Sequence, residues 1–101
     1  MISTFQDDAR LRRSNRVDET RVGDRVVLYH RDTGSGIVLN PTGSMIWDAL
    51  ATPQSAVDLA DALSSRYPGL PRDKITADVG VYVESLLENG LVASDSEQFG
   101  D

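Results

Sequence analysis

The 101-residue sequence contains no cysteine, one histidine and one lysine. Without cysteine, neither a disulfide framework nor a thiolate metal site can form. No apolar run approaches the roughly 20 residues that a membrane helix needs, and residues 1–13 lack the apolar centre of a signal peptide. These absences predict a soluble, cytoplasmic protein in a reducing compartment, without a membrane partner. The length and the 40% hydrophobic content suit one compact domain.

Residue types that carry catalysis are equally scarce. A Ser-His-Asp triad would have to use His30, and no G-x-S-x-G sequence accompanies it. Asp58 and Asp61 lie three residues apart, but a metal site needs three or four ligands and no His or Cys is near them. The run Gly34–Gly36 lacks the spacing and the Lys of a phosphate-binding loop. We therefore predict no catalytic residue, no metal site and no cofactor, and a small enzyme or metal protein is only our third hypothesis.

Charge is divided unevenly along the chain, whose formal net charge is −6. Residues 1–31 hold seven Arg and five acidic residues, a net +2, whereas residues 32–101 hold three basic and eleven acidic residues, a net −8. A nucleic-acid-binding protein needs several basic side chains on one face, because phosphate contacts supply most of its affinity. The pattern predicts no nucleic-acid partner, although a DNA-binding regulator is kept as the second hypothesis because of the fold inferred below.

Strand patterns occupy the first part of the chain. Val17–Val22 has weak edge-strand character, and Arg25–His30 is rich in the β-branched and aromatic residues that strands prefer. After a turn at Arg31–Gly34, Ser35–Leu39 reads as a third strand. We expect these segments to form a three-stranded antiparallel sheet.

Three helices are predicted to follow the strands. The first runs from Pro41 to about Leu50 with Asn40 as its N-cap, and Gly43 would let a neighbouring element approach closely. The second begins at Ser55, with Asp58 in capping-box position. The third runs from about Arg72 to Asn89. Their expected apolar faces are Ile46, Trp47 and Leu50 in the first helix; Val57, Leu59, Ala60, Leu63 and Tyr67 in the second; and Ile75, Val79, Tyr82, Val83, Leu86 and Leu87 in the third.

This order of elements predicts an α+β fold similar to a winged helix-turn-helix, with the sheet placed before the helices. We expect a flexible tail over residues 1–15, a folded domain over residues 16–93 and a second flexible tail over residues 94–101.

One edge of the predicted sheet is suited to binding an extended peptide. Ser35–Leu39 is small and apolar, with no Lys or Pro to block pairing, so its backbone groups would be open to another strand. The third helix would form one wall of a groove beside that edge, although Tyr82 and Trp47 also fit a simple role in the core. The candidate peptide-binding residues are Ser35, Gly36, Ile37, Val38, Leu39, Asp78, Val81, Tyr82 and Ser85.

Three segments in order carry a resemblance to a known family. The strand end Leu39–Asn40 is followed by Thr42–Gly43 and by Ile46–Trp47 at helical spacing. The segments SAVDLADALSSRYPG and ADVGVYVESLLENGLV come next. The ordered series resembles the PqqD-like domains, also called RiPP recognition elements, over about residues 17–92. The segment DALATPQ replaces the Cys-Asp-Gly-like ending of PqqD itself, and Trp47 with LNPTG is more similar to the standalone recognition proteins of lasso-peptide pathways.

The resemblance implies a function without catalysis. Such domains bind the leader segment of a ribosomally made precursor peptide as an added strand, and then present the precursor to a protease, a cyclase, or a radical or ATP-dependent tailoring enzyme. It implies that the leader pairs with Ser35–Leu39 and lies against the third helix. An acidic groove residue such as Asp78 could select Lys or Arg in the leader. An open edge strand could also pair with a second copy, so a homodimer is a further expectation.

Overall fold

The computed structural model describes residues 10–94, which form three helices and six strands. In chain order the elements are β1 (Arg10–Arg13), β2 (Val17–Val22), β3 (Arg25–His30), β4 (Gly36–Leu39), α1 (Pro41–Ala49), β5 (Gln54–Ser55), α2 (Ala56–Arg66), α3 (Arg72–Glu88) and β6 (Val92–Ser94). Among these residues, no helix is both long enough and apolar enough to cross a membrane. The predicted α+β class is confirmed, but the strands form two sheets instead of one.

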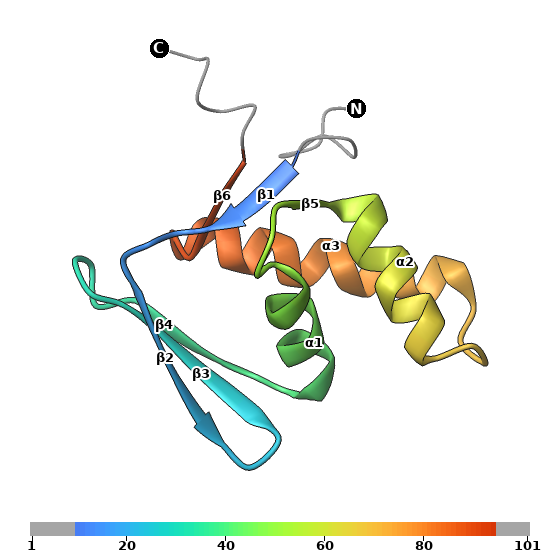
Figure 1. Ribbon diagram of the computed structural model, residues 1–101, viewed down its shortest axis with the longest axis horizontal. Helices are drawn as coiled ribbons and strands as arrows, with labels where there is room; N and C mark the ends of the chain where they lie inside the picture. Colours follow the sequence, from blue (N-terminus) through green and yellow to red (C-terminus); the bar gives the residue numbers. More distant parts are fainter. Residues whose placement is uncertain (1–9, 95–101) are drawn as a thin grey trace.

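The predicted antiparallel sheet is present in the order β2-β3-β4, at the lower left of the view in Figure 1. Thr20 pairs with Val27 across β2 and β3, and Val27 pairs with Val38 across β3 and β4. Val26 and Leu28 of the central strand are fully buried because one face of the sheet packs on the core. β2 and β4 are therefore the two edges of this sheet.

The second sheet corrects the predicted boundaries of the domain. β1 lies inside the segment expected to be a tail, and it pairs with β5 on one side and with β6 on the other (Figure 1). Leu11 of β1 is only 1% exposed, so this strand belongs to the core. Ser94, which was also assigned to a tail, lies in β6 and is buried. Residues 1–9 and 95–101 of the two predicted tails lie outside the described residues.

Local capping rules set the starts of α1 and α2 as predicted. The Asn40 side chain accepts a hydrogen bond from the Gly43 N–H at 2.9 Å, and Pro41 occupies the first position of α1. Ser55 and Asp58 form a reciprocal capping box at the start of α2. After α3, Gly90 has a φ of 71°, the left-handed conformation that favours glycine at this position.

The core gathers side chains from both sheets and from all three helices. Ile46 and Trp47 of α1 are buried, as predicted, and Leu91 and Val92 pack back onto the same core. Val57 is the exception among the residues expected on the apolar face of α2. It is 47% exposed because it lies to one side of the stripe that Leu59, Ala60 and Leu63 form along α2.

Candidate functional site

Two residues of β4 direct their backbone N–H and C=O groups away from β3, toward the open edge of the sheet. The His30 N–H donates to the Ser35 carbonyl at 2.7 Å, which identifies this pair as a hydrogen-bonded pair. Such pairs alternate along an antiparallel ladder. Gly36 and Val38 are therefore in non-hydrogen-bonded positions relative to β3, and their N–H and C=O groups point to the open edge. Two residues of β4 can thus hydrogen-bond to an added strand without any rearrangement of the sheet.

The side chains of β4 alternate between the core-facing and the outer face of the sheet. Leu39 is buried and Ile37 is half-buried on the core side. The Val38 side chain is 61% exposed on the outer face. Leu39, predicted as a peptide contact, therefore supports the edge from inside and presents little side-chain surface to a guest.

Helix α3 packs close to the end of β4 at Gly43 of α1. A Cβ built on Gly43 would lie 2.8 Å from Cε1 of Tyr82 and 3.1 Å from Cδ2 of Leu39. Glycine is the residue that allows such close packing, since any side chain here would meet the tyrosine ring. The predicted close approach at Gly43 is confirmed, and it brings Tyr82 next to the last residue of β4.

The other predicted residues of α3 share a face with Tyr82, because positions spaced three, four and seven residues apart align on a helix. Val81 is 68% exposed, whereas Asp78 and Ser85 are half-buried. The Ser85 carbonyl accepts a hydrogen bond from Nδ2 of Asn89 at 2.8 Å, which closes the last turn of the helix. Asn89 was not predicted as part of this wall.

Asp78 is already paired within α3. The Lys74 ammonium lies 3.2 Å from both carboxylate oxygens of Asp78. The partial neutralisation weakens the predicted preference of Asp78 for a basic guest residue, although the pair is exposed and its strength is therefore small. The wall that α3 offers to β4 is thus mainly apolar and neutral-polar in character.

A cavity of about 120 Å³ lies at the junction of α1, α2 and α3. Its walls are mostly apolar, and polar groups come from Thr42, Tyr67 and Asp78. The lining residues are Thr42, Leu63, Tyr67, Leu70, Ile75 and Asp78. Thr42 adjoins Gly43, and Asp78 is one turn from Tyr82, so the cavity is close to the end of the groove. This cavity could not be predicted from the sequence, because its residues come together only when the three helices pack.

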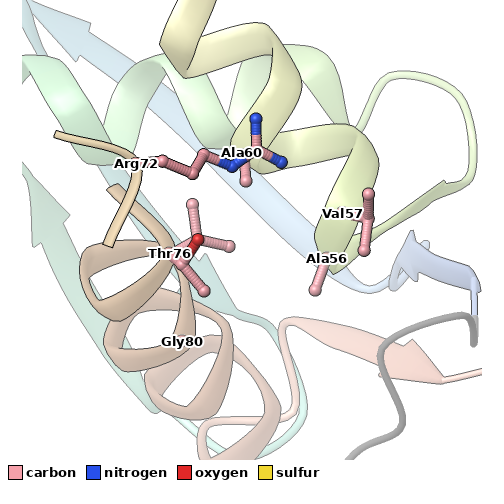
Figure 2. A pocket seen from close by; sticks show the side chains of 7 residues that line it. Ala56, Val57, Ala60, Arg72, Thr76 and Gly80 are labelled. Carbon is pink, nitrogen blue, oxygen red and sulfur yellow. The ribbon is translucent and has the colours of Figure 1, made fainter. Parts of the chain in front are cut away.

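A second cavity, of about 90 Å³, lies between α2 and α3 (Figure 2). Figure 2 shows Ala56 and Ala60 of α2 across from Thr76 and Gly80 of α3. Gly80 precedes Tyr82 by two residues, which places it on the opposite side of the helix. No heavy atom of residues 10–94 lies within 4 Å of a Cβ built on Gly80, so this glycine fulfils no packing requirement toward the described part of the chain. The cavity is separate from the groove beside β4.

The turn between β3 and β4 is stabilised by an ion pair and by hydrogen bonds to a histidine ring. Asp32 accepts two hydrogen bonds from the Arg16 guanidinium, at 2.7 and 2.9 Å. These bonds hold the pKa of the Asp32 carboxyl below its ordinary value. Nδ1 of His30 accepts hydrogen bonds from the backbone N–H groups of Asp32 and Thr33. His30 thus has a structural role in the hairpin.

On the other edge of the sheet, β2 is fixed to α1 by a carboxylate. Oε1 of Glu19 accepts a hydrogen bond from Nε1 of Trp47 at 2.8 Å, and Oε2 accepts one from Arg21 at 2.9 Å. The hydrogen bond from Trp47 is the main cause that lowers the pKa of Glu19, and burial opposes it. Arg21 also pairs with Asp48. The edge strand β2 is therefore held in place through its side chains.

Neither metal chemistry nor DNA binding is supported by the described residues. Residues 10–94 contain no cluster of three or more His, Cys, Asp or Glu side chains that could hold a metal ion. In α3, which lies wholly within this range, the two basic residues Arg72 and Lys74 pair with Asp61 and Asp78. A recognition helix needs basic groups that are available to phosphates.

Two solved structures share this fold and carry a bound peptide. One is described as TbiB1 in complex with the TbiA(beta) leader peptide. It is 27% identical, covers 80% of this chain and 93% of its own, and has a TM-score of 0.72. The other is described as lasso peptide synthetase B1 complexed with the leader peptide. It is 27% identical, covers 82% of this chain and 96% of its own, and has a TM-score of 0.68. No curated protein sequence gives a significant match.

A comparison of the sequence with protein-family models also identifies a relationship to one family. The model described as coenzyme PQQ synthesis protein D (PqqD) matches residues 25–92, which is more than half of the chain. The matched range runs from β3 to the first residue of β6 and includes the whole groove. The resemblance drawn from the three ordered segments is confirmed: the chain belongs to the PqqD family.

Proposed function

We propose that this protein binds the leader segment of a ribosomally synthesised precursor peptide by adding it as a strand to β4. The observation that carries the proposal is the pair of outward-facing backbone positions, Gly36 and Val38, at an edge that ends beside Tyr82. Strand addition draws affinity from main-chain hydrogen bonds and specificity from side-chain pockets. The solved relatives, which are bound to leader peptides, support the same interpretation.

The residues of the groove indicate which side chains such a leader should carry. A strand paired with Gly36 and Val38 directs every second side chain toward the core side, where Ile37 and Tyr82 are half-buried. An apolar side chain is favoured there, and the 120 Å³ cavity near Thr42 can take another. The proposed contact residues are Ser35, Gly36, Ile37, Val38, Leu39, Asp78, Val81, Tyr82 and Ser85, with Leu39 acting as the floor.

The domain contributes no chemistry of its own in this proposal. It holds the leader while the attached core peptide is delivered to a separate maturation enzyme, such as a protease or a cyclase. Leader binding and delivery take place in the cytoplasm, where ribosomes release the precursor.

A proline substitution at Val38 tests the proposal. The Val38 N–H points away from β3, so Val38→Pro removes a donor that only the guest strand would use. A titration of the protein with the leader encoded by a neighbouring precursor gene should give binding at micromolar concentrations. We expect Val38→Pro to lose that binding while keeping the far-ultraviolet circular dichroism of the wild type, and Val38→Thr to bind normally. Unchanged binding by a folded Val38→Pro protein contradicts strand addition at β4.

A further inference from the structure

The other edge of the sheet also has outward-facing backbone groups. The Arg31 N–H donates to the Arg16 carbonyl at 2.8 Å, so this pair is hydrogen-bonded. By the alternation of antiparallel pairs, Asp18, Thr20 and Val22 direct their backbone groups toward β3. Val17, Glu19 and Arg21 direct theirs away from it. Within residues 10–94, β2 pairs with β3 alone, and five of its six residues are exposed.

The charges on β2 complement a second copy of the same strand. When two β2 strands run antiparallel about a two-fold axis at Thr20, Glu19 of each copy lies opposite Arg21 of the other. Opposite charges in directly paired positions stabilise a sheet, and like charges destabilise it. Moving the axis to Asp18, Glu19 or Arg21 would place two identical charges face to face, and an axis at Val17 or Val22 would overlap the strands only at their ends. The register centred on Thr20 is therefore favoured.

The backbone supports the same register. Glu19 and Arg21 have their N–H and C=O groups on the open side, so each copy would form a hydrogen-bonded Glu19–Arg21 pair with its partner. Arg21 has room for this contact, because its side chain is 50% exposed although it already pairs with Glu19 and Asp48 of its own chain. β4, in contrast, carries no charge that would specify a self-pairing register.

We propose that β2 is the docking edge for a second copy of this chain, which pairs antiparallel about a two-fold axis at Thr20. Two sheets of three strands then become one continuous sheet of six strands, with the two β4 edges at its opposite ends. The interface is isologous and leaves both β4 edges accessible. This assignment does not depend on the proposed function, because it uses no residue of the β4 groove.

Cross-linking through single cysteines tests both the interface and its register, since the natural sequence has no cysteine. Thr20 would face its own copy across a non-hydrogen-bonded pair, in which Cα atoms are about 4.5 Å apart, a separation that permits a disulfide. Val22 lies on the same strand and the same face but opposite Asp18 of the partner, so the two Val22 residues would be about 13 Å apart along the strands. Under mild oxidation, Thr20→Cys should form a covalent dimer rapidly and Val22→Cys should not. Equal or faster cross-linking of Val22→Cys overturns the proposal.

Sedimentation of the unmodified full chain gives an independent measurement. We expect a monomer–dimer equilibrium at micromolar concentrations. Arg21→Glu would place like charges opposite each other at two symmetric positions, and we expect its dimer dissociation constant to rise at least about tenfold. Circular dichroism checks that this variant is folded. A wild-type chain that remains monomeric throughout this range, or a folded Arg21→Glu variant that dimerises like the wild type, overturns the proposal.

Discussion

Nε1 of Trp47 donates a hydrogen bond to Oε1 of Glu19, with 2.8 Å between the two atoms. Trp47 lies in α1 and Glu19 in β2, so the bond connects the first helix to the edge of the sheet. The Arg13 guanidinium of β1 stacks on the same indole at 4.3 Å and donates to the Trp47 carbonyl at 2.6 Å. The only tryptophan of the chain thus joins both sheets to the helix that follows β4.

The first prediction removes the acceptor of this bond. Glu19→Ala leaves the Nε1 of a Trp47 side chain that is almost fully buried without its partner. An unsatisfied buried donor costs about 1–3 kcal/mol, so the free energy of unfolding should fall by that amount. Urea denaturation followed by Trp47 fluorescence measures the change. Glu19→Gln is the matched control, because its amide oxygen can still accept the bond. Equal stability of wild type and Glu19→Ala would show that the bond contributes nothing.

The second prediction concerns pH. The pKa of Glu19 is lowered in the folded protein, mainly by the hydrogen bond from Trp47, so folding favours the ionised carboxylate. Its contribution is fully present above the ordinary Glu pKa of about 4.3, and it is lost as the pH falls through the lower pKa of the folded state.

The stability advantage of wild type over Glu19→Gln should therefore be constant near neutral pH and should shrink on acidification below about pH 4.3. The pKa of Asp32 is lowered as well, but Asp32 is present in both proteins and its effect cancels in the difference. Urea denaturation of both proteins over a pH series checks the expectation. A difference that grows on acidification would contradict the assignment.

The third prediction contrasts two glycines. Gly43→Ala places a Cβ 2.8 Å from the Tyr82 ring, and such overpacking costs typically about 1–3 kcal/mol. Gly80→Ala meets no atom of the described residues within 4 Å and should stabilise α3 by up to about 1 kcal/mol, because alanine is the better helix former. Thermal denaturation of the two variants should give shifts of opposite sign. A stabilising Gly43→Ala would show that Tyr82 is not held against α1.

The fourth prediction tests the position of β1. Leu11→Ala removes a side chain that is 1% exposed between β5 and β6, at an expected cost of about 2–5 kcal/mol. Arg10→Ala changes an exposed neighbour on the same strand, and its effect should stay within about 0.5 kcal/mol. Chemical denaturation distinguishes the two. If residues 10–13 were a flexible tail, both substitutions would be equally harmless.

Elements whose signals are local in the sequence could be predicted from it. Asn40–Pro41 and the Ser55–Asp58 capping box define the starts of two helices through contacts within a few residues, and both are confirmed. β1 was missed because Leu11 is the only apolar residue in an Arg-rich strand. Its pairing partners, Gln54 and Ser94, lie more than forty residues away in the sequence.

In the candidate site, too, some features could be predicted from the sequence and others could not. The strand and the helix face could be predicted from periodicity, and the close approach at Gly43 from the residue type. The burial of Leu39 and the pairing of Asp78 with Lys74 depend on tertiary packing or on side-chain conformation. Residue type and spacing alone do not specify these features.

Amide hydrogen exchange across β4 tests strand addition most directly. Ile37 and Leu39 direct their N–H groups toward β3, whereas Gly36 and Val38 direct theirs to the open edge. In the free protein, the amides of Gly36 and Val38 should exchange much faster than those of Ile37 and Leu39. When the leader peptide is bound, we predict strong new protection at Gly36 and Val38 and little change at Ile37 and Leu39. Leader binding that leaves Gly36 and Val38 unprotected would contradict the central claim that the peptide pairs with β4.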